Sequence, residues 1–254
     1  MIRELRDAFK GERTPSYALG VVLVAGSGVV FSFTALLFRG VENATDWQFL
    51  AYRGLGTALA MGILLVLRQP HRALRVDSFT WHSVVAGVLL AAMSMLFILA
   101  LSRTTAALVL FLQSASPFSG ALFGWLLLRE MVDRRTWAAM GAAVVGVAIM
   151  VGSGLEAGSA VGVLLAALIP VVLGLYNVLV KMAPDSDPVV PALVAGVVLT
   201  IGASSVALAR GGLSASPRDV VLGLAAGGVL LGVGLPMFNL GPVSYTHLTL
   251  PTTL

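Results

Sequence analysis

The residue with the clearest potential for chemistry is Arg53, a charged side chain inside an otherwise apolar segment. It follows Asp46, at the start of that segment, by seven residues, which is about 10 Å of helix. A charge at that depth in a bilayer costs about 2.5 kcal/mol or more, and such charges usually face a cavity or a partner. Thr57 lies on the same helical face, one turn further on. Arg53 is therefore either a counter-charge for a substrate carboxylate or phosphate, or an arginine that reaches the interface or ties helix ends together.

Further polar residues gather near prolines in the apolar segments. A proline frees a backbone carbonyl, often where a helical bundle lines a cavity. Each polar residue alone is best explained by hydrogen bonds between helices, worth about 1–2 kcal/mol or less. Taken together, the set favours a polar cavity that binds substrate. Its members are Gln113 and Ser116 beside Pro117, Tyr176 and Asn177 after Pro170, and Asn239 after Pro236, with the three prolines as candidate helix breaks or gates.

Several kinds of chemistry lack the residues they would need. The chain has no cysteine, which excludes disulfides and thiolate chemistry. It has no metal-ligand cluster, no phosphate-cradling loop and no His-Glu catalytic spacing. No Asp or Glu lies deep in an apolar segment. We therefore expect no catalytic residues, no metal and no cofactor, and we expect that the protein is not an enzyme.

The composition indicates an integral membrane protein. The 254 residues are 58% hydrophobic and only 11% charged, with a mean hydropathy of +0.96, whereas soluble domains carry about 25% charged residues. Continuous apolar runs without strand-like alternation predict an all-α polytopic helical bundle. Eight spans are expected, at Tyr17–Phe38, Asp46–Leu67, Trp81–Leu101, Thr104–Leu128, Trp137–Gly154, Val161–Val180, Val189–Ala209 and Val220–Gly241. Within the second, Gly54, Ala58 and Gly62 recur at every fourth residue and predict a close approach of helix backbones.

The basic residues indicate the orientation of the chain. Lys and Arg are concentrated before the first span and after the second and fourth, which places the N-terminus in the cytoplasm and the protein in the cell (inner) membrane. Because these residues lie between apolar runs instead of forming a basic face, we expect the lipid bilayer and a small-molecule substrate as partners, and no nucleic acid. A homodimer is left open.

The second half of the chain echoes the first. Residues 31–39 align with residues 173–181 at an offset of 142, and residues 97–101 align with 238–242 at an offset of 141. An odd number of spans per repeat inserts the second copy upside down. Such inverted repeats are typical of transporters that hold substrate between their two halves.

Several motifs in order carry a resemblance to a known family. They are Phe49-Leu-Ala-Tyr-Arg53-Gly, Thr104-Thr-Ala-Ala107, Ser114-Ala-Ser-Pro117, Leu126-Leu-Leu-Arg-Glu130 and Val145-Gly146-Val147. Over about Ala18 to Pro242, the sequence resembles EamA-like transporters of the drug/metabolite transporter superfamily. The resemblance implies ten spans in two inverted five-helix repeats, of which eight are present here. It also implies the movement of small metabolites, often outward.

The resemblance defines the expected domains. Residues 1–16 form a cytoplasmic tail, residues 17–154 the first five-helix repeat, and residues 155–242 an incomplete second repeat of three helices. Residues 243–254 are polar and resemble a translated sequencing adapter, because one reading of that adapter encodes Val243 to Thr252 without a mismatch. We expect this tail to be non-native and the chain to be truncated.

The expected function is membrane transport by alternating access. The substrates would be small polar metabolites such as amino acids, with export as the expected direction. Two alternatives stay open: an intramembrane enzyme or translocator acting on lipid-linked substrates, and a membrane subunit that does not itself transport.

Overall fold

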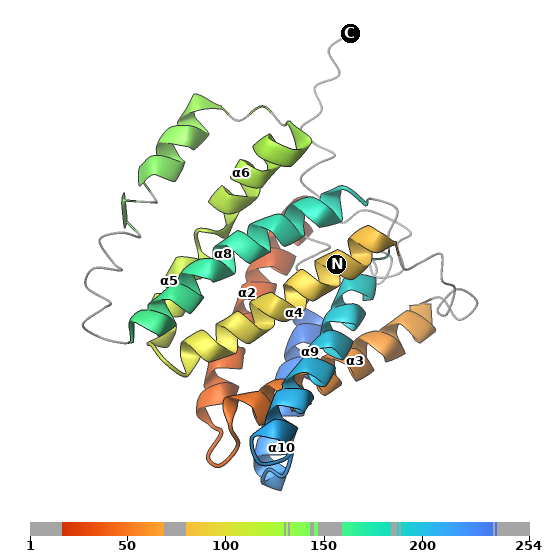
Figure 1. The fold of residues 1–254 in the computed structure, drawn as a ribbon. Coiled ribbons are helices and arrows are strands. Elements are labelled where there is room, and N and C mark those ends of the chain that lie inside the picture. Colours follow the sequence, from red (N-terminus) through yellow and green to blue (C-terminus); the bar gives the residue numbers. More distant parts are fainter. Residues whose placement is uncertain are drawn as a thin grey trace.

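Every regular element of the computed structural model, over the residues it describes, is a helix (Figure 1). The structure describes residues 17–68, 80–129, 131, 133–142, 145–146, 159–183, 187, 189–235 and 237. Residues 134–142 are also helical. The labelled helices are α2 (Tyr17–Arg39), α3 (Asp46–Arg68), α4 (Trp81–Leu101), α5 (Ala106–Gln113), α6 (Ser116–Leu128), α8 (Ala160–Lys181), α9 (Val189–Ala209), α10 (Pro217–Ala225) and the π-helical segment η2 (Ala226–Leu231).

The expected membrane spans are largely present. In the described part of the chain, seven helical stretches are long and apolar enough to cross a membrane, with α5 and α6 counted together and the last one running from Pro217 to Leu235. Large apolar side chains on the outer faces, such as Val29, Ile63 and Ile201, are 60–66% exposed, as expected where lipid is the solvent. The polytopic helical bundle is therefore confirmed. The expected fifth span, Trp137–Gly154, and both chain ends lie largely outside the described residues.

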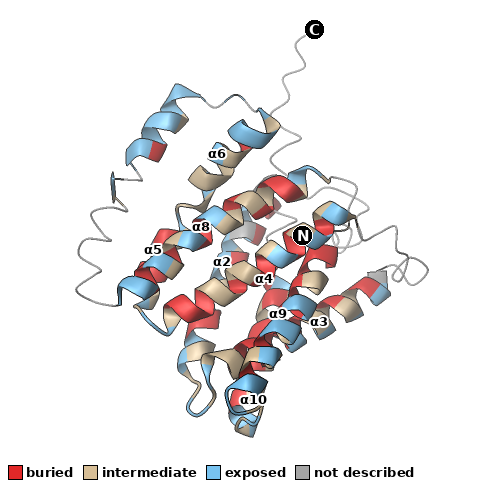
Figure 2. Cartoon of the chain, in the orientation of Figure 1, coloured by how far each residue is buried: buried red, intermediate tan, exposed pale blue. Residues whose placement is uncertain are grey.

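The bundle is organised around the crossing of α3 and α9. On one side α4 packs against both α9 and α8, and α5 and α6 lie against the far face of α8. On the other side α10 and η2 pack against α3 and α2. Buried residues follow the lines where α4, α8 and α9 meet (Figure 2). If α2, α3 and α4 are exchanged for α8, α9 and the α10–η2 helix, the contacts of α4 with α8 and α9 become those of η2 with α2 and α3, whereas the packing of α5 and α6 on α8 has no counterpart among the described helices.

The α3–α9 crossing brings two backbones into direct contact. A Cβ added to Gly54 would lie 2.6 Å from the backbone nitrogen of Thr200, and one added to Gly196 would lie 2.5 Å from that of Ala58. Both distances are too short for any real Cβ atom. The close approach predicted from Gly54 and Ala58 is thus confirmed, whereas Gly62 meets only a side chain of α9, at 3.8 Å.

Polar contacts join the connecting segments at one end of the bundle. The Asp219 carboxylate is fully buried and accepts hydrogen bonds from the backbone N–H groups of Glu42, Asn43 and Ala44 at 3.0–3.1 Å. At the same end Arg103 lies 3.7 Å from Asp46. The segments after α2, after α4 and before α10 therefore meet, as a chain that crosses a membrane back and forth requires.

Two substitutions on α9 test the helix crossing. Gly196→Ala should destabilise the protein by about 1–3 kcal/mol, because the new methyl group forces α9 away from α3. Gly202→Ala is the matched control, since nothing lies within 4 Å of a Cβ there; alanine is also the better helix former, so stability should hold or rise slightly. Thermal unfolding of the purified protein in detergent measures both. Equal stability of the two variants would contradict the crossing.

Candidate functional site

Four helices line a small cavity around Arg53. Its volume is about 20 Å³, which is enough for about one water molecule. The polar lining residues all come from α3 and α4, and the other two helices contribute apolar ones. The lining consists of Arg53 and Thr57 of α3, Leu90, Ala91, Met93 and Ser94 of α4, Ala195, Gly196 and Leu199 of α9, and Leu231 and Leu235 of the last helix.

Two of the three guanidinium nitrogens of Arg53 are buried without a hydrogen-bond partner among the described residues. The residue is only 3% exposed, and its Nε and Nη1 atoms are buried with no hydrogen-bond partner among the described residues. Asp46, the nearest acidic residue before it in the sequence, instead faces Arg103. The side chain therefore does not extend to the surface. A buried charge with unmade hydrogen bonds carries a large desolvation cost, which an anion in the cavity would offset.

Backbone contacts fix the position of Arg53. Its carbonyl accepts a hydrogen bond from the Thr57 hydroxyl at 2.9 Å. Gly227 lies against the same stretch of backbone, since an added Cβ there would lie 2.9 Å from the Thr57 backbone nitrogen. Gly227 belongs to the π-helical segment η2, which also brings Leu231 to the cavity wall. π-Helical turns are rare and frequently occur at functional sites.

Ser94 is a site residue that the sequence did not single out. Its hydroxyl is buried without a hydrogen-bond partner in the described structure, and it lines the cavity together with Arg53. The available signal was a hydroxyl between Met93 and Met95 in an otherwise apolar part of α4. That signal is weak, because a serine in a membrane helix commonly bonds its own backbone.

The cavity lining contains pairs of residues related by the offset of the sequence repeat. Adding 142 to the α3 positions and 141 to the α4 positions gives residues of α9 and of the last helix, and these residues line the same cavity. In each pair with a polar member, that member comes from the first half of the chain. The pairs are Arg53 with Ala195, Thr57 with Leu199, Leu90 with Leu231 and Ser94 with Leu235.

The other polar candidates form a separate group. Gln113 ends α5 and Ser116 begins α6, and both helices pack against α8, which carries Tyr176 and Asn177. The expected fourth span is interrupted here, since Ser114 and Ala115 form a turn and Pro117 follows in the first turn of α6. The Gln113 Oε1 atom is buried without a partner within the described residues. None of these four polar residues lines the Arg53 cavity.

The prolines differ in their effects. Pro117 accompanies a helix break, but Pro170 does not interrupt its helix, because α8 runs unbroken from Ala160 to Lys181. The expectation of a break at Pro170 is therefore wrong. A proline removes only one backbone bond, here the one to the Ala166 carbonyl, and the other hydrogen bonds of α8 keep the helix continuous. Pro236 and Asn239 lie outside the described residues.

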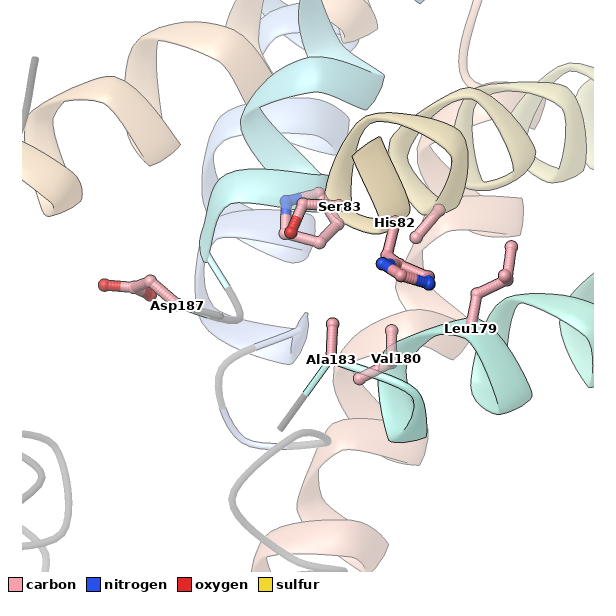
Figure 3. A pocket seen from close by; sticks show the side chains of 8 residues that line it. His82, Ser83, Leu179, Val180, Ala183 and Asp187 are labelled. Carbon is pink, nitrogen blue, oxygen red and sulfur yellow. The ribbon is translucent and has the colours of Figure 1, made fainter. Parts of the chain in front are cut away.

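A second hollow lies between the beginning of α4 and the segment that joins α8 to α9 (Figure 3). Its polar residues are His82, Ser83 and Asp187, and its volume is also about 20 Å³. The Asp187 carboxylate points away from the His82 imidazole and accepts a hydrogen bond from the Val189 backbone at 2.9 Å. These side chains do not converge on a common point, so the Arg53 cavity is the stronger candidate site.

Comparisons with known proteins agree with the architecture. Residues 18–152 match the EamA-like transporter family. A protein of known crystal structure is similar, with a TM-score of 0.60 and 18% sequence identity over 89% of this chain and 80% of the other. At that identity the match shows the fold alone. A search of curated proteins finds no significant match.

A pair of arginine substitutions tests whether Arg53 is a structural residue. Arg53→Met should leave thermal stability unchanged or raise it, because it removes a buried charge that has no partner. Arg103→Met should lower stability slightly, since Arg103 faces Asp46 and donates to the Leu99 carbonyl at 2.8 Å. Thermal unfolding in detergent reports both. A strongly destabilised Arg53→Met protein would identify the arginine as a tie between helices.

Proposed function

Because the chain belongs to the EamA-like transporter family, it is a multi-pass membrane transporter of the drug/metabolite type, and we propose that it exports small polar metabolites such as amino acids. Proteins of this family are generally not enzymes. We place it in the cell inner membrane with its N-terminus in the cytoplasm. The common end of the segments after α2, after α4 and before α10 is then the outer end.

The observation that carries the proposal is the unpaired guanidinium of Arg53 inside an enclosed cavity. A carrier needs a site that holds its substrate while water is excluded, and buried donors without partners provide one. Arg53 acts as the counter-charge for a carboxylate or phosphate, and Thr57 fixes its backbone. Gln113, Ser116, Tyr176 and Asn177 form a second polar region around α8 on the substrate route, with Pro117 at the helix break. We assign Asn239 and Pro236 to the same route, together with Pro170 as a proline inside the unbroken α8.

Alternating access is supported by the size of the cavity and by its walls. A space for about one water molecule does not admit a metabolite, so the substrate enters when the walls separate. The lining residues lie at positions related by the repeat offset, as expected for a site between two inverted halves. The π-helical turn at η2 is a natural point for such a movement, because its backbone hydrogen bonding already departs from that of an α-helix.

Flux measurements test the proposal. Proteoliposomes that contain the full chain and are loaded with a radiolabelled amino-acid pool should release label faster than empty liposomes. Arg53→Met should reduce that release to the background rate. Arg218→Gln is the matched control, because Arg218 is exposed and pairs with Glu42, which is also exposed; it should release label at the wild-type rate. Protein-dependent flux of no metabolite class would refute the proposed function.

A further inference from the structure

The cavity presents two chemically different walls to whatever it encloses. The wall from α3 and α4 carries the Arg53 guanidinium and two hydroxyls, those of Thr57 and Ser94, beside the apolar Leu90, Ala91 and Met93; every polar side chain of the lining lies on this wall. The wall from α9 and the last helix consists of Ala195, Gly196 and three leucines. A ligand that satisfies both walls is therefore charged at one end and apolar at the other.

The polar wall selects an acceptor group. The Nε and Nη1 donors of Arg53 are buried and unpaired, and so is the Ser94 hydroxyl. A carboxylate can accept from the guanidinium and from the serine together, and such charge-assisted hydrogen bonds are about twice as strong as neutral ones. One cation calls for one negative charge, which favours a carboxylate over a doubly charged phosphate.

The same wall disfavours a second cation on the ligand. The ammonium of an α-amino acid lies next to its carboxylate, so it would be held close to the Arg53 guanidinium in a site shielded from water, where like charges repel strongly. Among the described residues that line the cavity, no acidic side chain stands opposite. The Thr57 hydroxyl already donates its proton to the Arg53 carbonyl.

Resting on the carrier function proposed above, we infer that the Arg53 cavity binds a monocarboxylate that has a short apolar body and lacks an ammonium group. The carboxylate lies against Arg53 and Ser94. The apolar body faces Leu199, Leu231 and Leu235. By the offset of the sequence repeat, these three leucines correspond to Thr57, Leu90 and Ser94, respectively. Amino acids are then weaker ligands than the corresponding deaminated acids.

Three compounds with the same branched carbon chain separate the contributions. They are 4-methylpentanoate, leucine, which adds the ammonium group, and 3-methylbutylamine, which has the amine but no carboxylate. Binding is measured by calorimetry on the full chain in nanodiscs, and uptake of each labelled compound is measured in proteoliposomes. We expect 4-methylpentanoate to bind at least tenfold more tightly than leucine, and the amine to give no binding. Leucine binding as tightly as the acid, or more tightly, would overturn the inference.

Variants of the two walls complete the test. Arg53→Met should abolish the binding of 4-methylpentanoate, and Arg53→Lys should retain part of it, because it keeps the charge but loses the planar fork. Leu235→Ser should weaken 4-methylpentanoate severalfold while leaving acetate, which has almost no apolar body, unchanged. Binding that survives Arg53→Met, or an equal loss of both acids in Leu235→Ser, would refute the assignment of the walls.

The proposed substrate class and the proposed carrier function can be refuted independently of each other. Flux of amino acids without flux or binding of 4-methylpentanoate would overturn the substrate class and leave the carrier in place. Arg53-dependent binding of 4-methylpentanoate without flux of any compound would support the site and overturn the carrier function.

Discussion

The direct contact between helix backbones at glycine is the constraint on which the rest of the site depends. At Gly54 and Gly196, α3 and α9 approach so closely that no Cβ fits, and at Gly227 the π-helical segment meets the backbone of α3 beside Arg53. Close contacts of this kind replace the hydrophobic effect as the source of helix association in lipid. They also determine what surrounds Arg53. With α9 and η2 pressed against its own helix, the guanidinium is enclosed by backbone and apolar side chains, and little space is left for a protein counter-charge.

An enclosed cation without a partner gives the site a physical basis for binding and release. In the closed conformation the free energy of the empty site is high, because the Nε and Nη1 donors of Arg53 are buried and have no partner among the described residues. In the proposed cycle an anion relieves that cost once the walls have moved apart far enough to hold it, so the conformation that closes around the ligand is wider than the empty closed one and favours the loaded state. When the walls separate, water can hydrate Arg53 in place of the ligand, so the affinity of the site for the anion falls. A ligand shifts a conformational equilibrium only through such a difference in affinity between conformations, and one buried guanidinium supplies it.

Much of the fold was predictable because long apolar runs have few alternatives in a bilayer. The spans, the depth of Arg53 within its span with Thr57 on the same face, and the close approach at Gly54 followed from composition and helical spacing, whereas the choice between a cavity and the interface for Arg53 did not. Contacts that depend on the rotation of helices about their axes were not predictable. These include the partnering of Asp46 with Arg103, the turn of Ser94 into the cavity, and the burial of Asp219 by three backbone donors. The continuity of α8 through Pro170 was mispredicted, because the effect of a proline depends on neighbours that its own segment does not reveal.

The asymmetry of the two walls bears on which of them moves in the proposed cycle. Separating the ligand from α3 and α4 would break its charge-assisted bonds, whereas withdrawing α9 and the last helix loses only apolar contact. The last helix is therefore the cheaper wall to displace. At one end of the bundle, however, the buried Asp219 carboxylate holds the start of α10 to three backbone donors after α2, so opening towards that end requires these bonds to break. The described residues just beyond η2 are held by apolar packing instead, with Gly234 against Phe31 of α2 and Gly232 against Ala60 of α3. The last helix is fixed at its first turn and can bend at the π-helical turn of η2. In the proposed cycle, opening towards the opposite end of the bundle therefore costs less than opening towards the end that Asp219 closes.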